Sequence, residues 1–152
     1  MPDMNQQGNV FLIGPMGAGK TTIGRHLAAL LGKRFVDVDQ EIEKRTGVAI
    51  PVIFEIESEA GFRRRESAVI DELTRDRDIV LATGGGAVLM EENRQALKGR
   101  GTVVYLQADI ETLVERTRRD RNRPLLQTED PRGKIVELLR QREPIYRALA
   151  DV

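Results

Sequence analysis

The residues 14–22 read GPMGAGKTT and directly follow the apolar run VFLI at residues 10–13. Residues 14–21 fit G-x-x-x-x-G-K-[ST], the phosphate-binding P-loop. Its glycines let backbone N–H groups approach phosphate oxygens, and the helix that follows points its positive end at the anion. Lys20 supplies a mobile charge for the β and γ phosphates, and the Thr21 hydroxyl is placed to ligate Mg²⁺. A strand before the motif and a helix after it favour a phosphate site over an ordinary glycine-rich turn.

A P-loop alone does not choose between a kinase, a GTPase switch and an ATP-driven machine. A GTPase needs an N/T-K-x-D segment to read its base, and the sequence contains none. ATP-driven machines are usually larger than this chain of 152 residues. A short chain with a P-loop near its start therefore indicates a small-molecule kinase.

The composition and length suit a single kinase domain spanning residues 1–152, with 40% apolar and 32% charged residues. Basic and acidic residues both number 24, so the net charge is zero and no nucleic-acid partner is expected. The absence of cysteine excludes disulfides, thiolate metal sites and a cysteine nucleophile. No apolar run approaches the roughly 18 residues of a membrane span, and the polar start lacks a signal-peptide core. We expect a soluble, cytoplasmic monomer without a membrane partner.

Apolar runs alternate with amphipathic stretches, which predicts strands alternating with helices. Helices are expected to begin near Pro51 and after the N-cap Asp109. Further helices are predicted at residues 21–31, 40–46, 67–75, 91–98 and 131–142, and strands at residues 10–13, 35–39, 79–82 and 102–106. The first of these helices is expected to carry one apolar face, formed by Ile23, Leu27, Leu30 and Leu31.

Short apolar strands between helices predict an α/β fold of the P-loop NTPase type, a three-layer α/β/α domain with a parallel sheet. Ligands of such sheets bind beyond the carboxyl ends of the strands. The unusual segments 14–21, 37–39 and 84–86 are all expected at that edge. Their coincidence there is a stronger indication of a site than any one of them alone.

Two acids, Asp37 and Asp39, close the second predicted strand. If Asp37 keeps strand geometry, alternation points both carboxylates the same way. One acid can then hold Mg²⁺ through its water shell, and the other can orient and deprotonate an acceptor hydroxyl. The alternative is a strand-end acid followed by Asp39 as the N-cap of the next helix. The position opposite a P-loop favours the functional interpretation.

The segment FRRRE at residues 62–66 places three arginines on one predicted helix. Arg63 and Glu66 are three residues apart and can pair, which prepares the arginine to grip a carboxylate bidentately. Arg64 and Arg65 fit a solvated basic face equally well. The three glycines at residues 84–86 let the backbone come close to a ligand, although a plain flexible turn is the alternative.

Five arginines lie between residues 116 and 123, and residues 118–130 have almost no helical periodicity. We expect a basic lid loop over about residues 116–130 that closes over the triphosphate and excludes water. An exposed charged loop is the preferred interpretation for Arg118, Arg119 and Arg121. Arg142 could complement a helix dipole or join Arg63 on an anion, and spacing alone does not decide. His26, the one histidine, is expected at the surface without a catalytic role.

Together these residues resemble the shikimate kinase family. The P-loop is common to many kinases, whereas its combination with FR, GGG and RPLL is much more specific. The matching elements occur in the family's order and cover nearly the whole chain: GPMGAGKT at 14–21, DVD at 37–39, GFRRRE at 61–66, GGGAV at 84–88, RPLL at 123–126 and REPIY at 142–146.

The resemblance implies ATP-dependent phosphorylation of the 3-hydroxyl of shikimate, a step towards chorismate and the aromatic amino acids. It also implies a nucleoside-monophosphate-kinase-like fold with a five-stranded parallel sheet. The family normally continues past Val152 with a fifth strand and a last helix, so we expect that strand to be missing. At residues 58–61, SEAG stands where the family often has a more acidic run with an extra glycine.

The resemblance also implies a role for each matching residue. It assigns catalysis to Lys20, Asp39 and Arg123, with Asp39 as the candidate base and Arg123 as the lid arginine. It implies Mg²⁺ placement by Thr21 and Asp37. It implies ATP contacts by Gly17, Ala18, Gly19, Lys20, Thr21, Thr22, Arg116 and Arg123, with Arg116 near adenine. It implies shikimate contacts by Asp39, Phe54, Phe62, Arg63, Gly84, Gly85, Gly86 and Arg142, with Arg63 and Arg142 on the carboxylate.

Two other functions compete with this one. The nearest is a related kinase for gluconate or another small hydroxy acid, which also offers a carboxylate and hydroxyls. A nucleoside-monophosphate kinase fits less well, because such kinases usually carry D-G-[FY]-P-R where this chain has GGGAV. The alternative from another class is a non-catalytic nucleotide-binding module, which would keep Lys20 but would not need Asp39, Arg63 and Arg142 together.

Overall fold

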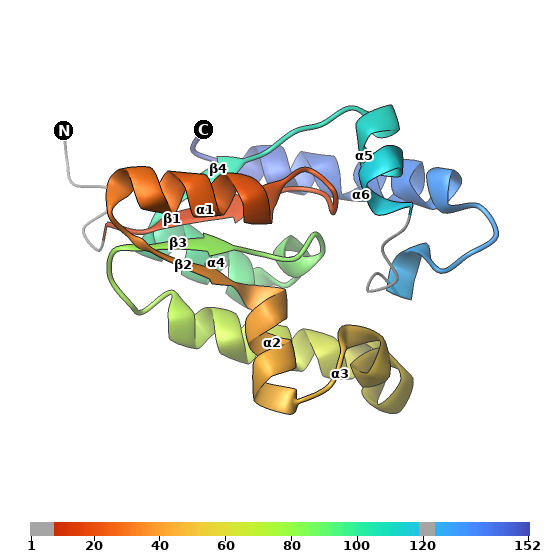
Figure 1. The fold of residues 1–152 in the computed structure, drawn as a ribbon, viewed down its shortest axis with the longest axis horizontal. Helices are drawn as coiled ribbons and strands as arrows, with labels where there is room; N and C mark the ends of the chain where they lie inside the picture. Colours follow the sequence, from red (N-terminus) through yellow and green to blue (C-terminus); the bar gives the residue numbers. More distant parts are fainter. Residues whose placement is uncertain (1–7, 119–123) are drawn as a thin grey trace.

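A parallel four-stranded sheet forms the centre of the fold in the computed structural model, which describes residues 8–118 and 124–152 (Figure 1). The strands are β1 (Val10–Ile13), β2 (Arg34–Asp37), β3 (Ile79–Ala82) and β4 (Thr102–Tyr105), in the order β2-β3-β1-β4. Every pairing is parallel, so each connection must cross over, and helices make these crossovers. The predicted α/β architecture is confirmed.

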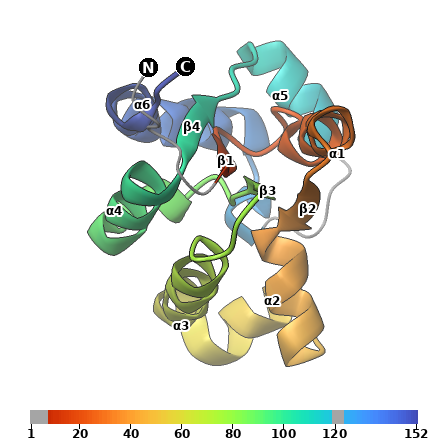
Figure 2. The same cartoon turned by 90° about the vertical axis from the view of Figure 1, so that its left-hand side faces the viewer.

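Six α-helices and two short 3₁₀ helices are found in the described ranges. They are α1 (Lys20–Leu31), α2 (Val38–Thr46), α3 (Ile50–Leu73), α4 (Glu91–Arg100), α5 (Ile110–Thr117) and α6 (Pro131–Leu149), with η1 (Ala87–Leu89) and η2 (Pro124–Leu126). Figure 2 shows α1 on one side of the sheet and α3 and α4 on the other. The fold therefore has the predicted three layers.

Successive side chains of β1 point to opposite faces of the sheet, so this strand contributes to the core on both sides. Phe11 and Ile13 belong to the core beneath α3 and α4, whereas Leu12 packs against Ala28 of α1. All three side chains are completely buried. A strand that is apolar at every position is what a parallel sheet covered on both faces requires.

The predicted apolar face of α1 is confirmed for Leu27, which is partly buried against the core that contains Leu12 and Ala28, but it is wrong for the other three residues. Leu30 is 83% exposed, and Ile23 and Leu31 are also exposed. The buried side of the helix instead carries Gly24 and Ala28. A Cβ on Gly24 would lie 2.5 Å from the Phe35 ring, so the helix packs closely through small residues rather than through its leucines.

Three predicted boundaries also differ from the structure. The helix predicted at residues 67–75 is the second part of α3, which begins at Ile50, is interrupted at Ser58 and ends at Leu73. The second strand ends at Asp37, because the Asp37 carboxylate accepts the Gln40 N–H at 3.0 Å and caps α2, which starts at Val38. Asp39 therefore lies in the first turn of α2 and is neither a strand residue nor the N-cap. The last helix runs to Leu149 rather than Arg142, with Pro144 inside it, because buried Tyr146 and Leu149 continue its apolar side.

The free edge of β4 pairs with the last two residues of the chain. Asp151 N–H donates to Val103 O at 2.8 Å, and Tyr105 N–H donates to Val152 O at 3.1 Å. The described sheet has four strands, the number predicted from the sequence. Among the described residues, no helix is long and apolar enough to span a membrane.

Candidate active site

The P-loop connects the carboxyl end of β1 to the start of α1. Gly17 has φ 87° and Gly19, the N-cap of α1, has φ 94°, conformations that residues with a Cβ avoid. Lys20 is only 8% exposed, and its Nζ donates to Gly14 O at 2.6 Å and Pro15 O at 2.8 Å. The loop thus holds a buried ammonium beside the positive end of a twelve-residue helix, which suits an anion.

A hydroxyl and a carboxylate meet next to this loop. Thr21 Oγ1 donates to Asp37 Oδ2 at 2.6 Å, which joins the first turn of α1 to the end of β2. Such oxygen donors are the ligands that Mg²⁺ prefers, with waters and phosphate oxygens completing its shell. The described residues contain no group of three or more His, Cys, Asp or Glu side chains able to hold a metal on its own. The donor set therefore fits a metal that arrives with a phosphate ligand.

A hollow of about 610 Å³ opens over the P-loop. Arg116 of α5 reaches it, and its Nη1 donates to Gly17 O at 3.1 Å. Ala18 packs into the apolar cluster around Leu113 instead of lining the hollow. The residues that line it, called here the phosphate pocket, are Met16, Gly17, Gly19, Lys20, Thr21, Thr22, Asp37, Asp39, Thr83, Gly84, Gly85 and Arg116.

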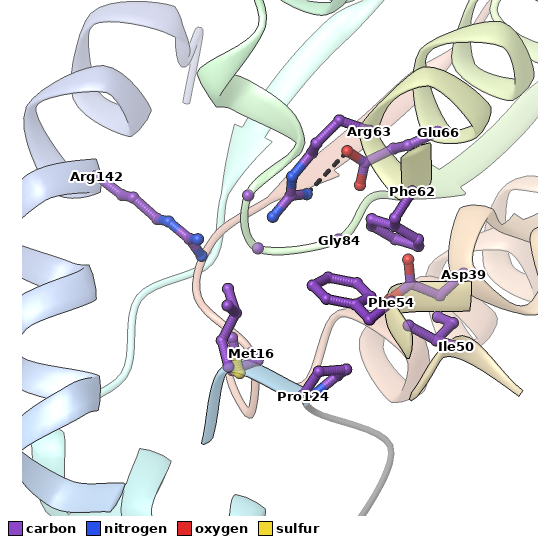
Figure 3. A pocket seen from close by; sticks show the side chains of 13 residues that line it. Met16, Asp39, Ile50, Phe54, Phe62, Arg63, Glu66, Gly84, Pro124 and Arg142 are labelled. Atoms are coloured by element: carbon purple, nitrogen blue, oxygen red, sulfur yellow. Dashed lines mark hydrogen bonds and ion pairs between the residues drawn. The ribbon is translucent and has the colours of Figure 1, made fainter. Parts of the chain in front are cut away.

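A second hollow of about 420 Å³, the acceptor pocket, adjoins the first (Figure 3). Met16, Asp39, Gly84 and Gly85 line both hollows, so the Asp39 carboxylate stands where they meet. The complete lining is Met16, Asp39, Ile50, Phe54, Phe62, Arg63, Glu66, Gly84, Gly85, Gly86, Pro124, Leu125 and Arg142. An acceptor bound here would lie directly beside a bound triphosphate.

Arg63 is held in the acceptor pocket by two carboxylates of its own helix. Its Nη1 donates to Glu66 Oε1 at 2.9 Å, and its Nη2 donates to Glu59 Oε2 at 3.1 Å. The predicted pairing of Arg63 with Glu66 is therefore confirmed. Burial raises the pKa of Glu66 to about 7, against the attraction of Arg63 and with the help of the nearby Asp39 charge. Glu66 Oε2 has no hydrogen-bond partner within the described part of the chain.

Arg142 enters the same pocket from α6. Figure 3 shows the guanidinium groups of Arg63 and Arg142 approaching each other from opposite sides of the pocket. Arg142 is 3% exposed, and its Nε lacks a hydrogen-bond partner among residues 8–118 and 124–152. Burial lowers the pKa of Arg142, and the Arg63 charge acts in the same direction. Since Arg142 lies more than one turn before Leu149, the helix-dipole alternative fails, and the two cations favour an anion between them.

The glycines at residues 84–86 bring the polar side chains together. A Cβ at Gly84 would lie 3.1 Å from both Asp39 Oδ1 and Glu66 Oε2, and one at Gly86 would lie 2.4 Å from Arg63 Nη2. Close approach, rather than a left-handed conformation, is what requires glycine here, since none of the three has a positive φ. The close approach expected from the sequence is present, and its partners are side chains of the pocket itself.

An aromatic wall faces these charges. The rings of Phe54 and Phe62 are 5.0 Å apart, and the Arg63 guanidinium lies 5.3 Å from the Phe62 centroid. The two phenylalanines come from the two halves of α3, which is interrupted at Ser58 with φ 66° and ψ 178°. The pocket thus combines a charged side for a carboxylate with an apolar side for a carbon ring.

Several predicted residues lie elsewhere. Arg123 is outside the described residues, as are residues 119–122 of the predicted lid. Arg116 and Thr117, at the start of the predicted lid loop, belong to α5, whereas Pro124 and Leu125 reach the acceptor pocket. Arg64 is exposed, and Arg65 pairs with Glu57, which agrees with a solvated basic face. The predicted surface position of His26 is confirmed.

Sequence reasoning missed parts of the lining. Met16, at a free position of the P-loop motif, and Thr83, beside the three glycines, gave no signal of their own. Glu66 was considered only as a partner of Arg63, yet it lines the acceptor pocket. Its three-residue spacing from Arg63 was the signal that could have included it.

Comparisons with known proteins agree with this geometry. The family model described as shikimate kinase matches residues 16–152. The shikimate kinase of Methylococcus capsulatus is 64% identical over 148 residues, covering 97% of this chain and 83% of that protein. That of Bordetella avium is 61% identical over 143 residues, covering 94% and 68%.

Solved structures give the same result. A shikimate kinase from Acinetobacter baumannii in complex with shikimate is 55% identical, with a TM-score of 0.94 over 97% of this chain and 83% of that one. A gluconokinase from Sinorhizobium meliloti, at 21% identity and a TM-score of 0.50, shares only the fold. From the match of the family model and the identity of these relatives, the chain belongs to the shikimate kinase family.

Proposed function

We propose that the protein transfers the γ-phosphate of ATP to the 3-hydroxyl of shikimate. The observation that carries the proposal is the arrangement of the acceptor pocket. Two guanidinium groups, those of Arg63 and Arg142, line it together with Asp39, at its junction with the phosphate pocket. Such a site can hold a small carboxylate by one end and present its hydroxyl to a phosphate at the other.

Arg63 and Arg142 would bind the shikimate carboxylate. Charge-assisted hydrogen bonds from guanidinium groups are stronger than neutral ones, and burial strengthens them further. Phe54 and Phe62 would pack on the carbon ring, and Gly84, Gly85 and Gly86 would run along it. The Acinetobacter baumannii relative, whose structure contains shikimate, supports this acceptor.

The P-loop would bind the phosphates of ATP. Gly17, Ala18 and Gly19 would offer backbone N–H groups, and Lys20 would supply positive charge. Thr22 and Arg116 line the same pocket. Arg116 would lie near the adenine base.

Thr21 and Asp37 would hold Mg²⁺, since their oxygens already meet at 2.6 Å. When bound, the metal neutralises charge on the phosphates.

Asp39 would contact the acceptor hydroxyl and take its proton as the phosphoryl group is transferred. Its carboxylate lines both pockets, which is the position that a base for this transfer needs.

We further propose a lid over residues 116–130 of a single kinase domain, with Arg123 reaching the ATP when the lid closes. Balanced charge supports a small-molecule enzyme over a nucleic-acid binder. A cytoplasmic monomer stays a prediction.

An ADP-release assay with shikimate and with gluconate as acceptors tests the proposal. We expect turnover with shikimate that depends on ATP and Mg²⁺, and none with gluconate at the same concentration. Turnover with gluconate alone would favour the related sugar-acid kinase. Nucleotide binding without turnover of any acceptor would favour a binding module and refute the proposed reaction.

A further inference from the structure

Tyr146 lies directly behind the acceptor pocket and is completely buried. It stands one helical turn after Arg142 on α6, and its hydroxyl donates to Gly85 O at 2.6 Å. Arg142 and Tyr146 are close enough to influence each other's charge. One side of α6 thus presents the Arg142 guanidinium to the acceptor pocket and the Tyr146 hydroxyl to residues 84–86, called here the glycine turn.

The glycine turn needs such an anchor. Glycine loses more conformational freedom on folding than any other residue, and here three follow one another. Ala87 N–H donates to Gly84 O at 3.1 Å, which closes a turn whose two central residues are Gly85 and Gly86. The Tyr146 hydroxyl then fixes the peptide between these two residues by the Gly85 carbonyl.

Gly85 lies where the two pockets meet and lines both of them. A Cβ on Gly85 would lie 3.3 Å from Met16 N of the P-loop and 3.4 Å from Arg142 Nη1. Since the peptide bond is planar and trans, fixing the Gly85 carbonyl also fixes the direction of the Gly86 N–H. A small rotation at this point would change the surface on which the acceptor rests.

The hydroxyl is a permanent donor. Burial raises the pKa of Tyr146 to about 12, so the phenol stays protonated at any pH at which the enzyme would be assayed. Removing it would leave the buried Gly85 carbonyl without this donor, which costs more than an average hydrogen bond contributes.

We propose that Tyr146 is a positioning residue for the acceptor: its hydroxyl fixes the central peptide of the glycine turn and aligns that turn with Arg142. The inference rests on the proposed function, because it assigns the residue to the shikimate side of the reaction. Tyr146 itself lines neither pocket and acts through Gly85 and Arg142.

The test replaces, one at a time, two tyrosines whose rings pack against each other, Tyr146 and Tyr105. Tyr105 and Tyr146 have ring centroids 5.0 Å apart, but the Tyr105 hydroxyl donates to Glu143 Oε2 and not to Gly85. Tyr146→Phe removes the hydroxyl that contacts Gly85, and Tyr105→Phe is the matched control. KM for shikimate, KM for ATP and kcat are measured for both variants and the parent.

We expect Tyr146→Phe to raise KM for shikimate about five- to tenfold, the equivalent of one hydrogen bond, with KM for ATP within about twofold. Tyr105→Phe should leave both constants unchanged. Thermal unfolding with and without shikimate gives a second measure that needs no turnover, because a ligand that binds more weakly stabilises less. Tyr146→Phe should gain less from shikimate than the parent, even if its own melting temperature falls.

Parent-like KM and shikimate stabilisation in Tyr146→Phe would overturn the inference, as would an equal rise in KM for ATP. An effect of the same size in Tyr105→Phe would also overturn it, because ring packing would then be responsible. If the parent itself does not phosphorylate shikimate, the proposed function fails instead. The two failures are therefore distinguishable.

Discussion

Glu66→Gln should make the protein less sensitive to rising pH. Glu66 is completely buried, and its pKa rises from an ordinary 4.5 to about 7 in the folded protein. The unfolded chain therefore gives up this proton at a lower pH than the folded one. The ionised group costs no stability below the unfolded pKa, costs more as pH rises from 4.5 to about 7, and costs its full amount above that.

The size of the effect follows from the two pKa values. Their difference of about 2.5 corresponds to about 3 kcal/mol of unfolding free energy at alkaline pH. Between about pH 5.5 and about pH 8, the part that changes is about 2 kcal/mol. Glutamine has the same shape, carries no charge and keeps an oxygen to accept from Arg63 Nη1. The variant should thus lack the pH-dependent part while most of the pocket packing stays.

The assay is urea unfolding of the parent and the variant across this pH range, without ligands. The difference in unfolding free energy, variant minus parent, should rise by about 2 kcal/mol from the acidic to the alkaline end. The attraction between Arg63 and the ionised Glu66 is already part of what sets the pKa of about 7, so its loss in the variant is included in this pH-dependent difference. A difference that stays flat within about 0.5 kcal/mol would refute the raised pKa and the burial argument behind it.

Three further changes test other parts of the site. Lys20→Ala should abolish turnover with shikimate while circular dichroism shows an intact fold, and normal turnover would contradict the phosphate assignment. Arg63→Ala should raise KM for shikimate at least tenfold, because a charge-assisted contact contributes about 1.5–3 kcal/mol; a rise in KM for ATP alone would contradict its role. Ser58→Gly should raise the unfolding free energy in urea by about 1 kcal/mol, since φ 66° and ψ 178° strain a residue with a Cβ; an unchanged or lower value would argue against strain.

Local chemistry made much of the site predictable. The P-loop motif predicts a phosphate site by itself, because glycine, lysine and threonine are each needed at fixed spacing to hold a phosphate. The three-residue spacing of Arg63 and Glu66 predicted their ion pair, because residues three apart are neighbours on a helix surface. Because the carboxyl ends of parallel strands share one edge of a sheet, residues 14–21, 37–39 and 84–86 could be predicted to lie together there.

Packing decided what local patterns could not. The apolar face of α1 was visible in the sequence, but a helix can also pack through small residues, and Gly24 against Phe35 gave the closer approach. The last helix was predicted to end at Arg142, yet α6 continues through Pro144 to the buried Tyr146 and Leu149. In both places tertiary contacts overrode a local preference.

The acceptor pocket shows why spacing alone could not decide that Arg63 and Arg142 meet. Asp39, Arg63 and Arg142 come from α2, α3 and α6, and no periodicity relates positions so far apart in the sequence. All three side chains approach the glycines at 84–86. A Cβ would lie 2.4 Å from Arg63 at Gly86, 3.1 Å from Asp39 at Gly84 and 3.4 Å from Arg142 at Gly85. A run of glycines at the end of a buried strand weakens that strand, so its presence indicates that other groups must approach the backbone there. Such a run predicts where a site lies, and the side chains packed against it determine what that site can bind.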